Sequence, residues 1–208
     1  GNLAVYINEH GKNSILDLID RSNELDPEII EDVMVNNKLT GLHIMASPKE
    51  PEIVDTHKGE SVSKILTYMK QLYSYIVIDT TSYLTEIVQT CLDVADYIIL
   101  ISTQDIPAIK NTNQFLHIAD ASSIPRDKIF FVMNKYDKRI AISPERVGES
   151  LKQPVSVTIP FEERIVTSAM NRGVPFMMDN KTAPAGKAML QMAEIIRNKV
   201  QKDQENGL

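Results

Sequence analysis

The sequence predicts an α/β fold with a mostly parallel sheet flanked by helices. Three apolar runs that each end abruptly in polar residues carry this prediction, namely Tyr75–Ser82, Tyr97–Thr103 and Ile129–Lys135. A continuous apolar run of this length is typical of a strand that is covered on both faces, as in parallel sheets. Stretches of helical length lie between the runs, so we expect right-handed β–α–β units with one polar rim above one sheet.

The composition limits the class of protein. The chain has 208 residues, of which 43% are hydrophobic and 24% are charged, as in an ordinary globular domain. The net charge of −6 argues against a broad phosphate-binding surface, so no nucleic-acid partner is expected. The one cysteine, Cys91, excludes an internal disulfide, and no apolar stretch is long enough to span a bilayer. We expect a cytoplasmic protein with a single domain over residues 1–208.

Helix starts are clearly marked in the first part of the chain. Ser14 is a capping residue for a short helix. A second start, Asp26-Pro27-Glu28, combines a cap, a first-turn proline and an acid at the positive end of the helix dipole. Over residues 1–82 we expect helices at Ile15–Asp20, Asp26–Val35 and Glu60–Tyr73, and strands at Gly41–Ser47 and Tyr75–Asp79, while Leu3–Asn8 is either a strand or a switch-like segment.

The rest of the chain continues to alternate helices and strands. A proline follows a capping serine at Ser143-Pro144, which marks a further helix start. Because proline is tolerated at a sheet edge, the short strand Pro154–Ile159 should be an edge strand. After residue 82 we expect helices at Leu84–Val94, at Ile106–Ala119, from Ser143, at Phe161–Asn171 and at Pro184–Lys202, besides the strands named above.

Asp79 is the candidate metal-binding and catalytic residue. It ends the apolar run that begins at Tyr75, and the hydroxyl residues Thr80-Thr81-Ser82 follow it. In open α/β sheets, ligands bind at the carboxyl edge of the strands, where this carboxylate would lie. Mg²⁺ is held by few carboxylates and keeps several waters, so one Asp at this place suits a magnesium or phosphate-switch role. An Asp that only caps the next turn is the alternative.

Asn134-Lys135-Tyr136-Asp137 is the candidate base-binding stretch, and it follows the apolar run that begins at Ile129. The amide of Asn134 both donates and accepts hydrogen bonds, as a purine edge requires, and the stem of Lys135 can lie over a base. The spelling Asn-Lys-x-Asp is also the guanine signature of GTPases, in which the Asp accepts two donors of guanine. An ordinary polar exit from a strand is the alternative.

Pro160 and Phe161 form the second candidate base-binding element, together with the stretch Gly173-Val174-Pro175. A proline directly after a strand fixes a rigid turn, and such a turn can form one wall of a base pocket. Plain loop geometry is the alternative for these residues.

Taken in order along the chain, these motifs resemble the MinD/ParA-type deviant P-loop ATPases, with the CpaE/TadZ proteins of Flp pilus assembly as the closest group. The resemblance implies a P-loop NTPase fold that binds ATP and Mg²⁺. It implies that Asp79 stands in the place of the Walker B Asp and Asn134 in that of the adenine-reading Asn, with Pro160 and Phe161 bordering the base. The matching stretches are Gly1–Ile7, Ser14–Ile19, Tyr75–Asp79, Ala95-Asp96, Thr103–Ala108, Asn134–Asp137, Ile142-Ser143, Ile159-Pro160 and Gly173–Pro175.

The resemblance also implies partners and a place in the cell. Proteins of this family form homodimers that sandwich two nucleotides, so ATP would act as a switch by binding one state better than the other. The expected partners are proteins of the pilus assembly or secretion machinery. The expected location is the cytoplasm, with peripheral recruitment to the inner membrane or the cell pole.

Two features depart from the family pattern. No glycine-rich phosphate loop occurs, and the 8 glycines are scattered, so the chain cannot cradle a triphosphate by itself. The family's first strand and P-loop would precede Gly1, so we expect the C-terminal part of a longer protein. Many relatives have Gly or Pro after the Walker B Asp, whereas Thr80 follows Asp79 here.

Three functions stay open: an ATP-binding protein with weak ATPase activity, a non-hydrolysing scaffold, and a GTPase that uses Asn134–Asp137.

Overall fold

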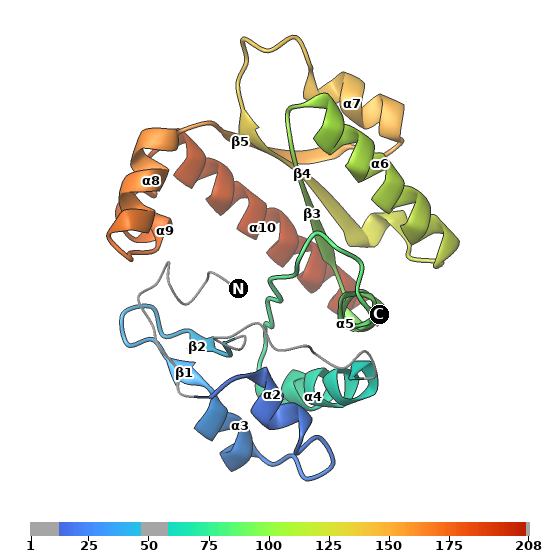
Figure 1. Ribbon diagram of the computed structural model, residues 1–208. Helices are drawn as coiled ribbons and strands as arrows, with labels where there is room; N and C mark the ends of the chain where they lie inside the picture. The colour runs from blue at the N-terminus through green and yellow to red at the C-terminus, as the bar shows by residue number, and fades with distance from the viewer. Residues whose placement is uncertain (1–12, 47–57, 207–208) are drawn as a thin grey trace. The chain divides into compact units, whose positions relative to one another are not determined.

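The computed structural model describes residues 13–46 and 58–206 (Figure 1). The strand or switch-like segment expected at 3–8 lies outside the described residues. The chain divides into two compact units, the first comprising residues up to Ala95 together with Arg172–Val174, and the second comprising the remainder. The single domain expected over residues 1–208 therefore stays a prediction.

The first unit contains the predicted helices and a small hairpin. Ser14 and Asp17 form a capping box at the first helix, and the Asp26 carboxylate accepts the Ile29 N–H at 2.7 Å. These caps confirm the helix starts that the sequence predicts. The elements are α2 (Ile15–Ile19), α3 (Pro27–Val33), β1 (Val35–Asn36), β2 (His43–Ile44), α4 (Gly59–Leu72) and α5 (Glu86–Val94).

A hydrophobic core holds the helices of the first unit together. Leu18 of α2, Ile30 of α3 and Ile65 of α4 are fully buried in it. Lys70, in the last turn of α4, donates to the Val94 carbonyl at 2.9 Å and so ties α4 to the end of α5. The apolar stripe of α4 therefore faces the core, as its periodicity predicts.

The strand predicted over Gly41–Ser47 is shorter than expected and pairs differently. The strand within its described residues is β2, which pairs antiparallel with β1. The turn between them is closed locally, because the Asn37 carboxamide accepts the Thr40 N–H at 2.8 Å and Gly41 adopts a φ of 73°. A local hairpin thus takes the place of a strand in the parallel sheet.

The prediction that Tyr75–Asp79 is a strand of the parallel sheet is wrong. The run has no regular secondary structure, and no strand of the described chain pairs with it. Tyr75 is 61% exposed and Val77 is 88% exposed, while Ile76 packs against the core of the first unit. An apolar run becomes a strand only where neighbouring backbone groups pair with its N–H and C=O groups, and the described residues supply no such neighbour.

The second unit contains a parallel sheet of three strands in the order β3–β4–β5. The strands are β3 (Ile98–Thr103), β4 (Ile129–Tyr136) and β5 (Val155–Pro160). β5 lies at an edge of this sheet, as Pro154 predicts. Thr103 is in register with Asn134, and Tyr136 with Pro160, so the polar ends of the strands meet at one edge.

Helices cover both faces of this sheet, α10 on one face and α6 and α7 on the other (Figure 1). Phe131, Val132 and Met133 are all fully buried, as successive residues of a strand are only when both faces are covered. Val132 packs against α10 through Ala185 and Ala188. The remaining elements are α6 (Ile106–Ala121), η1 (Arg126–Lys128), α7 (Pro144–Leu151), α8 (Glu163–Asn171), α9 (Phe176–Asp179) and α10 (Pro184–Glu205). No helix of the described chain is long and apolar enough to cross a membrane.

Candidate functional site

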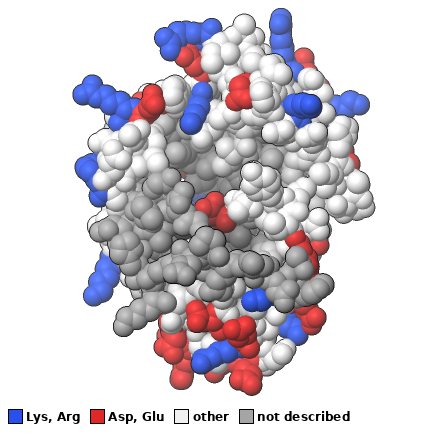
Figure 2. Space-filling model, viewed as in Figure 1, with Lys and Arg blue, Asp and Glu red and all other residues white. Residues whose placement is uncertain are grey.

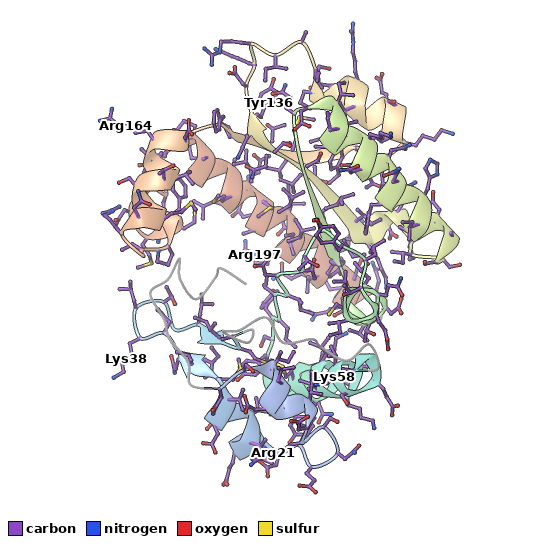
Figure 3. The ribbon with its side chains drawn as sticks, in the orientation of Figure 1. Arg21, Lys38, Lys58, Tyr136, Arg164 and Arg197 are labelled. Atoms are coloured by element: carbon purple, nitrogen blue, oxygen red, sulfur yellow. The ribbon has the colours of Figure 1, made fainter. Side chains whose placement is uncertain are left out.

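The carboxyl edge of the sheet in the second unit brings together four of the residues that the sequence singled out. Asn134 and Lys135 lie at the end of β4, and Pro160 and Phe161 lie at the end of β5 beside it. Phe161 donates its N–H to the Tyr136 carbonyl at 3.0 Å, which continues the pairing beyond the strands. Tyr136 marks this end of β4 in Figure 3, near the start of α6.

Asn134, near the end of β4, has a side-chain amide that is only partly used in hydrogen bonds within the protein. Its Oδ1 accepts the Lys135 N–H at 2.8 Å, and its Nδ2 makes no hydrogen bond within the part of the chain that the structure describes. Lys135 adopts a φ of 52°, in the left-handed region that non-glycine residues rarely enter. The pairing of β4 with β5 shifts register across this residue. Such strain costs about 1–3 kcal/mol and clusters at functional sites, which makes this strand end a candidate site.

Gln104 fixes the loop that follows β4, and the sequence did not identify it as a site residue. It comes directly after β3, is 5% exposed, and reaches both ends of the loop with one amide. Its Oε1 accepts the Asp137 N–H at 2.8 Å, and its Nε2 donates to the Ile142 carbonyl at 2.7 Å. A polar residue after an apolar strand carries no signal for such a double contact, so only the fold reveals it.

Asp137, the guanine-type acceptor of the motif, is occupied by Arg139. The guanidinium donates from Nε to Oδ1 at 2.9 Å and from Nη2 to Oδ2 at 2.5 Å. This hydrogen-bonded guanidinium, with the Arg139 N–H, lowers the pKa of the Asp137 carboxyl to about 2. At neutral pH the carboxylate is therefore ionised and bound within its own loop.

The turn after β5 is fixed from the side of α10. Glu162 accepts the Ala185 N–H at 2.6 Å, so it caps a helix that begins 22 residues later in the chain without a side-chain cap of its own. Gly186 permits this arrangement, because a Cβ there would lie 2.0 Å from the Asn180 carbonyl oxygen. The ring of Phe161 stays 47% exposed beside this anchored turn. The turn can therefore present an aromatic surface in a fixed position.

Asp79 lies in the other unit, in the extended segment after α4. Its side chain is exposed, and Thr81, two residues later, donates to the Tyr83 carbonyl at 3.3 Å. Within residues 13–46 and 58–206 no group of three or more His, Cys, Asp or Glu side chains could hold a metal ion. One carboxylate with neighbouring hydroxyls fits Mg²⁺, which takes few protein ligands and keeps its waters.

The charged side chains of residues 13–46 and 58–206 form no basic cradle for a triphosphate on the face that Figure 2 shows. On the face shown in Figure 2, Lys and Arg side chains are scattered among acids instead of forming one basic patch. Exposed acids gather on and beside α3 in the first unit, namely Glu24, Asp26, Glu28, Glu31 and Asp32. The sequence also has no glycine-rich loop whose N–H groups could bind phosphates. The residues present thus fit a base and a magnesium ion, but they do not fit the phosphates.

A family model described as an AAA domain matches residues 2–126 of the chain. The matched stretch includes Asp79, whereas Asn134 and Pro160 lie beyond it. A protein from Methanocaldococcus jannaschii, the uncharacterized protein MJECL24, is 28% identical over 95% of this chain and 82% of its own length.

Solved structures show the same fold. The crystal structure of a ParA family ATPase from Chlorobium tepidum has a TM-score of 0.84 at 18% identity, over 93% of this chain and 80% of that one. The septum site-determining protein MinD from Pyrococcus horikoshii, complexed with Mg-ADP, has a TM-score of 0.76 at 18% identity, over 94% of this chain and 78% of its own. The chain therefore belongs to the AAA domain family whose model it matches, and its fold is that of the MinD and ParA ATPases.

Proposed function

We propose that this chain is an adenine-nucleotide-binding protein of the CpaE/TadZ type. In this proposal it positions pilus assembly or secretion machinery through nucleotide-dependent homodimerisation. It acts in the cytoplasm and is recruited to the inner membrane or the cell pole. The order of its motifs supports the assignment, and a MinD of the same fold is complexed with Mg-ADP.

The geometry of Asn134 is the observation that carries the adenine assignment. Adenine presents an amino donor next to a ring-nitrogen acceptor, and a carboxamide matches this pair with its own acceptor and donor. Oδ1 of Asn134 keeps a second lone pair after accepting the Lys135 N–H, and Nδ2 has no partner among the described residues. Both halves of the amide can therefore serve one base, with Pro160 and Phe161 beside it.

Asp79, in the first unit, is proposed to hold a magnesium ion. Its exposed carboxylate needs no rearrangement of a buried network to take up a hydrated ion. The ion, when bound, would neutralise phosphate charge. The part of Asp79 is to accept hydrogen bonds from the waters of that ion or to bind it directly.

Nucleotide affinity of the chain should be low, because only the base and the metal have candidate ligands among the described residues. A base with few polar contacts and little buried area supports affinity in the millimolar range, about 4 kcal/mol. AMP is the suitable probe, since it carries the base with the smallest demand on phosphate ligands. We expect AMP to shift the backbone amide signals of Asn134, Lys135 and Phe161 in ¹⁵N NMR titrations.

Asn134→Ala tests the base site directly. The variant should bind AMP at least several-fold more weakly, since it loses both polar contacts to adenine. Asn111→Ala is the matched control, because Asn111 is an exposed asparagine on α6 and should bind AMP like the wild type. Equal binding by the Asn134 variant, or shifts that avoid the ends of β4 and β5, would overturn the adenine assignment.

A non-hydrolysing scaffold is the second candidate function; the 208 residues hold no glycine-rich phosphate loop, so we expect no turnover of ATP by this stretch alone. Without N–H groups and a lysine placed on the β- and γ-phosphates, the chain has no means to stabilise the charge that develops in phosphoryl transfer. We expect no release of phosphate from ATP above the uncatalysed rate. Steady turnover that Asp79→Asn abolishes would instead establish an ATPase.

A further inference from the structure

The motif Asn134–Asp137 contains the acceptor that guanine would need. Guanine presents two adjacent N–H donors, and one ionised carboxylate accepts both. Asp137 lies three residues after Asn134, so on spelling alone the loop could read guanine. We propose that Arg139 is a base-specificity determinant, because its guanidinium occupies both carboxylate oxygens of Asp137 and thereby denies guanine its acceptor. This inference rests on the proposed base site at Asn134.

The pairing of Asp137 with Arg139 is built into a tight turn. Ile140 donates its N–H to the Asp137 carbonyl at 3.0 Å, so residues 137–140 form a β-turn. The carboxylate at the first position of this turn accepts the Arg139 N–H at 2.9 Å, the contact for which Asp is favoured there. The turn therefore places Arg139 two residues from the carboxylate, and its guanidinium reaches the carboxylate within the same loop although the Arg139 side chain is 83% exposed.

Gln104 fixes the same loop from its buried side. It accepts the Asp137 N–H, and with its other amide atom it binds the Ile142 carbonyl at the end of the loop. The backbone of Asp137 is thus anchored, and the carboxylate cannot move away from Arg139 by a shift of the loop. A guanine base would have to displace a guanidinium with charge-assisted hydrogen bonds to both oxygens.

The test compares AMP and GMP, which differ only in the base, by ¹⁵N NMR titration of the whole chain. The wild type should prefer AMP. Arg139→Ala keeps the backbone N–H contact of the turn but removes the guanidinium, so GMP affinity relative to AMP should rise about two- to fivefold, the range of an exposed ion pair. Arg139→Lys should restore part of the preference, because an ammonium neutralises the carboxylate without the two-pronged contact.

Two variants separate this role from a general effect of charge. Lys138→Ala removes the same charge from the neighbouring exposed residue and should leave the ratio of GMP to AMP affinity unchanged. The double variant Arg139→Ala/Asp137→Ala should lose the gain in GMP affinity, because the acceptor is gone. In carboxyl ¹³C titrations, the pKa of Asp137 should rise from about 2 towards its ordinary value in Arg139→Ala.

The outcomes distinguish this inference from the proposed function. An unchanged ratio of GMP to AMP affinity in Arg139→Ala, with AMP still bound at Asn134, overturns the role of Arg139 and leaves the adenine site standing. A wild type that prefers GMP overturns both. Failure of the wild type to bind either nucleotide near Asn134 also overturns both. An unshifted Asp137 pKa in Arg139→Ala refutes the ion pair, and with it the role of Arg139, and leaves the adenine site standing.

Discussion

Gln104 gives the sharpest prediction about the candidate site, because one buried amide fixes the loop after β4. Gln104→Met keeps the length and approximate volume of the side chain but removes its donor and its acceptor. The Asp137 N–H and the Ile142 carbonyl then lose partners at 2.8 and 2.7 Å. Each lost hydrogen bond costs about 1 kcal/mol, and each group left unpaired costs about 1–3 kcal/mol where water cannot reach it.

The expected loss of stability depends on how far water can reach the unpaired Asp137 N–H and Ile142 carbonyl. Asp137 and Ile142 are only half-buried, so water can replace part of each contact. We expect the free energy of unfolding of Gln104→Met to fall by about 2–3 kcal/mol. Urea unfolding followed by far-ultraviolet circular dichroism measures it. Gln114→Met on the exposed face of α6 is the matched control and should change stability by less than about 0.5 kcal/mol.

Gln104→Glu tests the same two hydrogen bonds, which we call the Gln104 clamp, through the pH dependence of stability. At neutral pH the introduced carboxylate keeps an acceptor for the Asp137 N–H. Its second oxygen, however, would lie next to the Ile142 carbonyl oxygen and repel it, so folding should raise the pKa of the introduced Glu. A raised folded pKa contributes stability below the unfolded value of about 4.3 that is lost as pH rises through the folded value. The variant should therefore approach the wild type near pH 4 and fall behind it towards pH 7. Equal stability of all three proteins at pH 7 would refute the clamp.

Two further predictions concern Asp79 and Tyr97. Asp79→Asn should abolish any gain in ADP affinity that Mg²⁺ gives in NMR titrations, while the urea midpoint stays unchanged because the side chain is exposed; an unaltered magnesium dependence would leave Asp79 as a turn residue. The Tyr97 hydroxyl donates to Asp203 at 2.7 Å. Burial is the largest cause, and this hydrogen bond the second largest, of the rise in the pKa of Tyr97 from 10.0 to about 12. Its contribution to stability is full below about pH 10 and is lost as pH rises towards 12, so urea unfolding should show a steeper loss over this range for the wild type than for Tyr97→Phe. Parallel curves for the two proteins would mean that the hydroxyl contributes nothing.

Local sequence signals predict most of the elements, because caps and turns act over a few residues. Asp26 and Ser143 each accept an N–H three residues later, as their positions before a proline predict. The placement of Asn134 and Pro160 at the same edge of the sheet was also predictable, since the carboxyl ends of neighbouring parallel strands lie at one edge. These features depend on short-range chemistry or on strand direction alone.

The contacts that define the site depend on long-range geometry and were not predictable. Gln104 binds residues 33 and 38 positions away, and Glu162 accepts the N–H of a residue 23 positions away. Arg139 is different, because an Asp followed two residues later by Arg in a turn is a local signal that sequence reasoning could have used. That signal alone indicates that the Asp137 carboxylate is engaged within its own turn.

The run Tyr75–Asp79 shows why a strong apolar pattern can still mislead. The pattern states that these side chains favour burial, but a strand also needs a partner for its backbone, and the pattern does not name one. Side-chain burial and backbone pairing are also separate in the second unit. Ile99 and Ile101 of β3 are 38% and 58% exposed although their backbones are paired with β4. The backbone hydrogen bonds to β4 do not by themselves cover these side chains. Backbone pairing and side-chain burial are thus independent conditions. The backbone of β3 is paired while only some of its side chains are buried. Tyr75–Asp79 has no paired strand within the described chain, and its side chains are only partly buried.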